Sequence, residues 1–95
     1  MKSVRFVAEF SEPLTREVLV SMLYVCSCYK AQGQKVAFTF SKGLLGQYDD
    51  GINGVMSAQI VMRRILELID LCKDFSEADK RSVRSLTRVV RVVDV

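Results

Sequence analysis

Residues 4–10 alternate between apolar and polar positions in a way typical of a β-strand. Phe6 and Ala8 fall on one face, whereas Arg5 and Glu9 fall on the other. A period of two with one apolar face indicates a strand that covers a core. We therefore predict a first strand over residues 4–10.

The apolar pattern then changes, and residues 12–32 are predicted to form one helix. Ser11 offers an N-cap oxygen, Pro13 suits a first turn, and Gly33 supplies the left-handed residue that often follows a helix. Residues 18–29 carry no charge, and on a helix their apolar side chains would cover almost the whole circumference. This run is too short to span a membrane, which needs roughly 20 apolar residues.

A helix that is apolar on all sides is buried on all sides, and one sheet covers only one of them. We therefore expect a second copy of the chain to cover the rest, so that the protein is a non-catalytic regulatory or protein-interaction module acting as a homodimer. The expected dimer interface consists of Leu19, Val20, Leu23, Tyr24 and Ser27.

A second strand is predicted over residues 35–41, where Val36, Phe38 and Phe40 share one face. The order strand, helix, strand suggests a right-handed crossover and a parallel pair. A third strand is needed for a stable sheet, and residues 44–48 and 89–95 are the two candidates.

The second half of the chain predicts two further helices. Asn53 can cap a helix over residues 54–73, and Ser76 with Asp79 resembles a capping box that starts another. Residues 88–95 are rich in valine, which favours a strand over a continued helix.

The favoured fold is therefore an α+β two-layer sandwich with ferredoxin-like βαββαβ order, and the alternative is βαβ followed by two helices. The 95 residues, 49% of them apolar, fit one domain over residues 1–95. Three cysteines are an odd number and too few to stabilise a fold by disulfide bonds, so we expect buried free thiols. We also expect a cytoplasmic location and no membrane partner.

The chain lacks the usual ingredients of a catalytic or metal site, because it contains no histidine. Cys26 and Cys28 would point away from each other on a helix. The loop from Gly43 to Gly54 matches no phosphate-binding motif. We expect no enzyme activity, no catalytic residues, no metal and no cofactor.

One local charge bias remains, near the C-terminus, and it motivates nucleic-acid binding as the alternative function. If residues 76–93 were one helix, the basic groups would form one stripe that contacts phosphates; on a strand, Arg88 and Arg91 would point to opposite faces. The candidate phosphate contacts are Lys80, Arg81, Arg84, Arg88 and Arg91, a segment with no acid in it.

Overall fold

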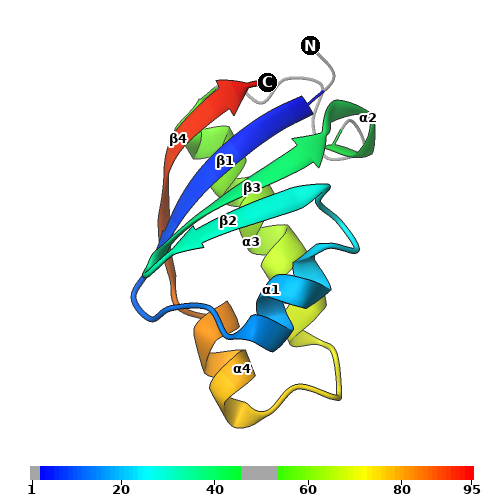
Figure 1. The fold of residues 1–95 in the computed structure, drawn as a ribbon, viewed down its shortest axis with the longest axis vertical. Coiled ribbons are helices and arrows are strands. Elements are labelled where there is room, and N and C mark those ends of the chain that lie inside the picture. The colour runs from blue at the N-terminus through cyan, green and yellow to red at the C-terminus, as the bar shows by residue number, and fades with distance from the viewer. Residues whose placement is uncertain (1–2, 46–53) are drawn as a thin grey trace.

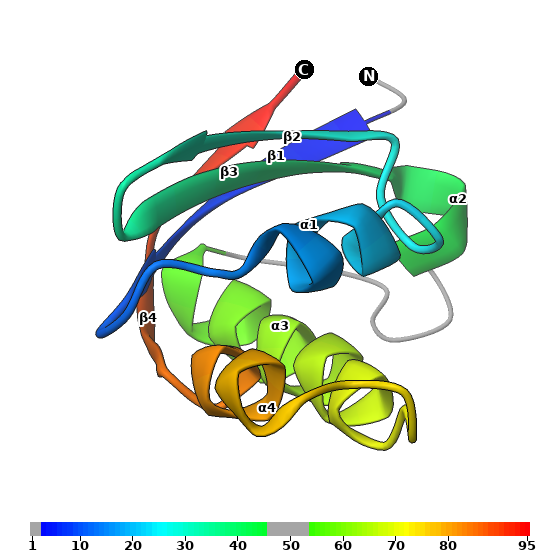
Figure 2. The ribbon, with the colours of Figure 1, turned by 60° about the horizontal axis from the view of Figure 1, so that its bottom comes forward.

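The structure, a computed structural model, describes residues 3–45 and 54–95, which form a four-stranded sheet with helices on one face (Figures 1 and 2). The strands lie in the order β2-β3-β1-β4, and each neighbouring pair is antiparallel. This is the ferredoxin-like sandwich, so the predicted two-layer fold class is confirmed. The elements are β1 (Ser3–Phe10), α1 (Arg16–Met22), β2 (Cys28–Gln32), β3 (Lys35–Ser41), α2 (Lys42–Leu45), α3 (Val55–Asp70), α4 (Glu77–Val83) and β4 (Leu86–Asp94).

The core lies between the sheet and the helices. Phe6 of β1 and Phe40 of β3 are fully buried on the helix side of the sheet, with ring centroids 5.1 Å apart. Met22 of α1 and Met62 of α3 are also fully buried in the same cluster. The helices therefore cover one face of the sheet and leave the other face open, as Figure 2 shows along the upper edge of the molecule.

The two predicted helices of the second half are confirmed, each with somewhat different ends. α3 begins after Gly54, whose φ of 93° suits glycine; the predicted cap Asn53 lies outside the described residues. α4 begins with the predicted capping box, in which Ser76 and Asp79 bond each other's backbone N–H. The valine-rich tail is a strand, β4, as favoured.

The predicted helix over residues 12–32 is wrong, because this segment contains a helix, a turn and a strand. α1 is capped by Thr15 rather than Ser11 and ends at Met22. β2 then pairs with β3 through a two-residue hairpin at Gly33 and Gln34. Gly33 has a φ of 61°, which serves a tight hairpin as well as a helix end, so its presence alone does not distinguish the two structures.

Two further expectations about the sheet fail. β1 and β3 are neighbours but antiparallel, since β2 and its hairpin reverse the chain between them. Of the predicted weak strand over residues 44–48, the described part belongs to helix α2, and residues 46–48 lie outside the described residues.

The direction of the side chains of β4 also differs from the prediction. The register pairs Ala8 with Val89 and Val7 with Arg91, so Val90 is an extra residue in a β-bulge. In a regular strand, side chains three residues apart point to opposite faces. Because Val90 is an extra residue, the Arg88 and Arg91 side chains point to the same face instead.

A polar network joins α4 to the N-terminus of α1. The Thr15 hydroxyl donates to Asp79 Oδ1 at 2.6 Å and accepts from the Val18 N–H. The hydrogen bond from Thr15 is the main cause that lowers the pKa of the buried Asp79 carboxyl, and bonds from Ser76 add to it while burial opposes them. Asp79 is therefore held as a carboxylate that ties two helix starts together.

No helix among the described residues combines the length and the apolar character that crossing a bilayer requires.

Candidate functional site

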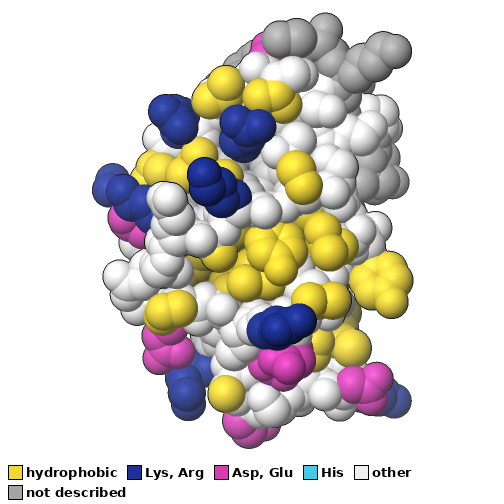
Figure 3. Space-filling view, viewed as in Figure 1, with side chains coloured by type: hydrophobic (Ala, Val, Ile, Leu, Met, Phe, Trp, Pro, Cys, Tyr) yellow, Lys and Arg dark blue, Asp and Glu magenta, His cyan; other side chains and the backbone are white. Residues whose placement is uncertain are grey.

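The side of the sheet away from the helices, here called the open face, gathers basic side chains from all four strands. Arg5 of β1 pairs in register with Thr39, and Lys30 of β2 pairs with Ala37 of β3. Arg91 of β4 lies opposite Val7 of β1. Figure 3 views this face, with Lys and Arg side chains in dark blue beside a yellow apolar area. Its four cations in one hollow are Arg5, Lys30, Lys35 and Arg91.

The hollow between these cations has a volume of about 530 Å³. Val7 and Ala37 lie among its lining residues and give it an apolar part. Neighbouring strands are about 4.8 Å apart, so the distance across the sheet from β2 to β4 is about 14 Å. Basic groups spread over that width can contact several negative groups of an extended ligand at once.

The four cations keep their charge available. Arg5 Nε donates to the Thr39 hydroxyl at 3.3 Å, a neutral partner that orients the guanidinium. Among residues 3–45 and 54–95, none of the four forms an ion pair with a carboxylate. For the described residues, the register places one acid on the open face, Glu9, which lies opposite both Lys35 and Arg88 and forms its ion pair with Arg88 at 3.3 Å.

The candidate phosphate contacts predicted in the C-terminal segment are divided between two surfaces: Arg81 and Arg84 line a hollow together with Glu12 and Glu77, whereas Arg88 and Arg91 share the open face. Arg81 pairs with Glu12 at 3.1 Å, and Arg84 pairs with Asp70 at 3.0 Å. Lys80 lies on α4, on the helix layer rather than the open face. Of the five predicted residues, Arg91 alone lines the hollow of the open face as the structure describes it.

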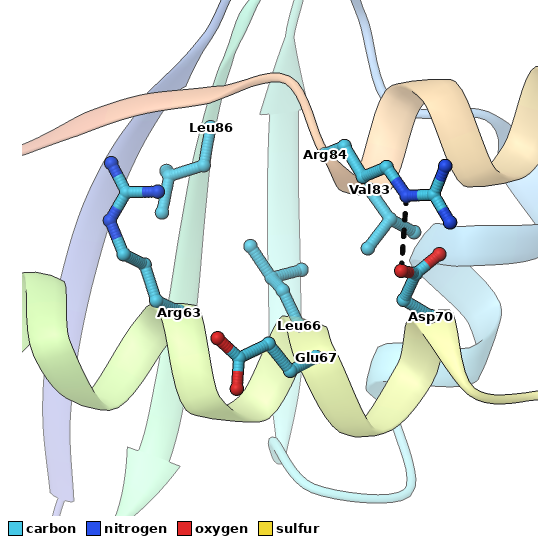
Figure 4. Close-up of a pocket in the computed structure, with 7 residues that line it drawn as sticks. All are labelled: Arg63, Leu66, Glu67, Asp70, Val83, Arg84 and Leu86. Atoms are coloured by element: carbon cyan, nitrogen blue, oxygen red, sulfur yellow. Dashed lines mark hydrogen bonds and ion pairs between the residues drawn. The ribbon is translucent and has the colours of Figure 1, made fainter.

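The Arg84–Asp70 pair closes a second, smaller cleft of about 180 Å³ between α3, α4 and the start of β4 (Figure 4). Arg63 and Glu67 extend from α3 on the side where the apolar side chain of Leu66 points into the cleft. Basic and acidic groups alternate here, so the cleft has no net preference for one sign of charge. We interpret it as the junction of α3 with α4.

The three cysteines differ in exposure, which corrects the expectation that all are buried. Cys26 is buried, and burial, followed by the charge of nearby Cys28, raises the pKa of its thiol to about 11. Cys28 and Cys72 are exposed, and Cys28 lines the hollow of the open face. Within the described residues no cluster of three or more potential ligands could hold a metal ion.

The residues of the predicted dimer interface do not lie on one helix, because α1 ends at Met22, and Leu23, Tyr24 and Ser27 follow it. Val20 and Leu23 are each about half exposed, and Tyr24 is 91% exposed in the turn that follows the helix. Leu19 packs partly against the core, and the Ser27 hydroxyl donates to the Thr39 carbonyl. The premise of one helix apolar on all sides no longer holds, and an interface at this place stays a prediction.

Three of the four open-face cations were missed from the sequence. Lys30 stood inside the predicted helix, where its place on a strand could not be recognised. Arg5 and Lys35 stood on the polar sides of two strands predicted to be parallel neighbours. A two-residue hairpin at Gly33 between residues 28–32 and 35–41 would place Lys30 and Lys35 on adjacent strands, but Gly33 suits a helix end equally well, and no local signal points to Arg5.

No protein-family model, curated protein sequence or solved structure matches this chain, so the site is interpreted from its own geometry.

Proposed function

We propose that the chain binds the phosphate backbone of nucleic acid on the open face of its sheet, without reading the base sequence. The observation that supports this proposal is the hollow lined by four cations that form no ion pair among the described residues. Lysine and arginine release condensed counterions when they neutralise phosphates, and this release favours binding at low salt. The ligand class follows from the sign and the spread of the charges.

The side chains of the open face explain why the backbone, rather than the bases, is the proposed contact. Base recognition on a sheet uses exposed aromatic rings on which bases stack. Here Phe6, Phe10, Phe38 and Phe40 all face the helices and are fully buried. Tyr29 lines the hollow but is half-buried and packs against the core, so it does not offer a free ring face. Contacts from lysine and arginine alone position a ligand but carry no sequence information.

The proposed role is binding without catalysis, in a reducing compartment such as the cytoplasm. The sequence offers no histidine for proton transfer near neutral pH. Cys26, Cys28 and Cys72 are all free thiols, which suits such a compartment.

The proposal is tested by titrating the protein into fluorescent 20-nucleotide single-stranded DNA and RNA between 50 and 200 mM salt. If four phosphates are contacted, the logarithm of the binding constant should fall with the logarithm of salt with a slope of about −3. Oligonucleotides of different sequence should bind within a fewfold of one another. Absence of binding at 50 mM salt, or binding that does not respond to salt, would contradict the proposal.

Anionic phospholipid vesicles serve as the control for the source of the phosphate. Four of the residues that line the hollow are cations, and its apolar or aromatic lining is limited to Val7, Tyr29 and Ala37, less than an amphipathic surface needs to insert into a bilayer. Vesicles of matched phosphate concentration should therefore bind more weakly than the oligonucleotides. Equal or tighter binding to vesicles would overturn the choice of nucleic acid as the ligand.

A further inference from the structure

Thr39 is a buried polar residue within the hollow of the open face. It belongs to β3 and lines the hollow, yet it is 9% exposed. Its register partner on β1 is Arg5, whose Nε donates to the Thr39 hydroxyl at 3.3 Å. The Thr39 carbonyl accepts from both the N–H and the hydroxyl of Ser27, just before β2. The strands on both sides therefore hold Thr39 at a fixed place in the floor of the hollow.

The hydrogen bond between Arg5 and Thr39 differs from those that the other arginine Nε groups donate among residues 3–45 and 54–95. Arg81, Arg84 and Arg88 each donate their Nε–H to a carboxylate, which holds the guanidinium and also offsets its charge. Arg5 donates to a neutral hydroxyl, so its guanidinium is held while its charge remains uncompensated. Within the described part of the chain, it is the one cation of the hollow whose charged group is held by a hydrogen bond.

A guanidinium that is held through its Nε still presents both Nη groups to a ligand. Arginine has five N–H donors in one rigid plane, and Thr39 accepts from one of them. The two Nη groups match two oxygens of one phosphate, with which they form two parallel hydrogen bonds. Lysine contacts a phosphate as a point charge and lacks this geometry. Because Thr39 orients the group in advance, less side-chain freedom is lost when the phosphate binds.

We propose that Arg5 binds one phosphate of the ligand through both of its Nη groups, and that Thr39 is the positioning residue that orients Arg5 for this contact. This inference rests on the proposed binding of nucleic acid, and it names the group recognised, a phosphate with two free oxygens. The other three cations of the hollow contribute mainly through their charge. Affinity should therefore depend on the geometry of Arg5 as well as on the number of cations.

Substitutions that preserve charge separate the geometry of Arg5 from its charge. Thr39→Val keeps the β-branched shape without the hydroxyl, and Arg5→Lys keeps the charge without the planar group. Each should weaken binding to the 20-nucleotide single strand at 50 mM salt about fivefold. The salt slope should stay that of the wild type, because the number of cations is unchanged. The two substitutions together should cost little more than either alone, since both remove the same interaction.

Three further variants show whether the loss comes from the proposed contact. Thr39→Ser keeps a hydroxyl and should restore most of the affinity that Thr39→Val loses. Thr87→Val and Arg88→Lys make the same chemical changes at exposed residues of β4 outside the hollow, and both should bind as the wild type does. Losses in these two controls as large as those at Thr39 and Arg5 would contradict the proposal. Circular dichroism will show whether Thr39→Val keeps its fold, and Arg5→Lys tests the same interaction from its other side.

The orientation of Arg5 is also measurable without a ligand, from the exchange of its Nε–H with water in the ¹⁵N-labelled chain. Exchange should be several-fold slower in the wild type and in Thr39→Ser than in Thr39→Val, and equal exchange in all three would exclude the positioning role. Salt-dependent binding by the wild type that Thr39→Val and Arg5→Lys both retain in full would overturn this inference alone. Absence of oligonucleotide binding by the wild type would overturn both this inference and the proposed function.

Discussion

The C-terminal basic segment and the open face hold similar numbers of cations, but only the open face leaves them available to a ligand. In the segment, Arg81, Arg84 and Arg88 each pair with a carboxylate from a distant part of the sequence. In the hollow of the open face, the four lining cations come from four different strands and form no ion pair among the described residues. Arg91 belongs to both groups, whereas Arg88 lies on the same face outside the hollow and is paired with Glu9.

This difference shows that a cluster of charge along a sequence is not the same as charge available on a surface. The partners Glu12 and Glu9 are far from the segment in sequence, and Asp70 lies outside it on another helix, so a search for acids within the segment could not find them. Strand pairing has the opposite effect on the open face, because it brings together basic residues that are isolated in the sequence.

The largest expected effect comes from neutralising two charges in each group. Lys35→Gln with Arg91→Gln should weaken single-stranded oligonucleotide binding at 50 mM salt about tenfold or more and reduce the salt slope by about 1.4. Arg81→Gln with Arg84→Gln changes the net charge equally, yet should leave the slope unchanged because both arginines already have partners. Anisotropy titrations measure both variants. Equal losses in the two variants would show that net charge, rather than the open face, governs binding.

A smaller effect is expected on the free energy of unfolding. Here substitutions in the C-terminal segment should matter, and substitutions in the open face should not. Arg84 and Asp70 are 63% and 24% exposed, so a double-mutant cycle with alanine should give a coupling free energy of about 0.2–1 kcal/mol. The other Asp70 oxygen is buried and has no hydrogen-bond partner among the described groups, so losing Arg84 leaves the carboxylate poorly satisfied. Urea unfolding measures the cycle, with Lys35→Ala as a control that should change stability little. A zero coupling would mean that the pair does not hold α3 to α4.

The smallest effect is confined to acid pH and concerns Asp79. Because hydrogen bonds lower its pKa in the folded state below the ordinary 3.8, the unfolded chain takes up the proton first as the pH falls. The carboxylate therefore stabilises the fold above about pH 4, and this contribution is lost progressively as the pH drops through the folded-state pKa. Asp79→Asn should lower the urea midpoint at pH 7, and its difference from the wild type should shrink between about pH 4 and pH 2. A difference that is constant over this range would exclude the carboxylate as the cause.

The sequence predicts the parts of the fold that rest on strong local periodicity. The first strand, α3, the capping box at Ser76 and the valine-rich last strand all follow from patterns of a few neighbouring residues. The predicted ferredoxin-like order is confirmed, but one of its strands is β2 (Cys28–Gln32), which was predicted as helix, and not the weak strand predicted over residues 44–48.

The parts that failed depend on contacts between distant residues. Residues 18–29 suggested one helix apolar on all sides, but they contain the end of a helix, a turn and the start of a strand. Gly33 did not reveal this, because it suits both a helix end and a hairpin. The shared face of Arg88 and Arg91 depends on the bulge at Val90, which exists only in the pairing with β1. The open face therefore emerges from strand pairing, and no local pattern contains it.

Alkylation of Cys28 in the presence and absence of an oligonucleotide tests the central claim most directly. Cys28 lines the hollow of the open face, Cys72 is exposed beyond the end of α3, and Cys26 is buried, so the native chain carries the reporter and its control. With saturating single-stranded oligonucleotide, N-ethylmaleimide should modify Cys28 several-fold more slowly, while Cys72 keeps its rate. Unchanged modification of Cys28 in a chain that has bound the oligonucleotide would place the ligand elsewhere and contradict the account.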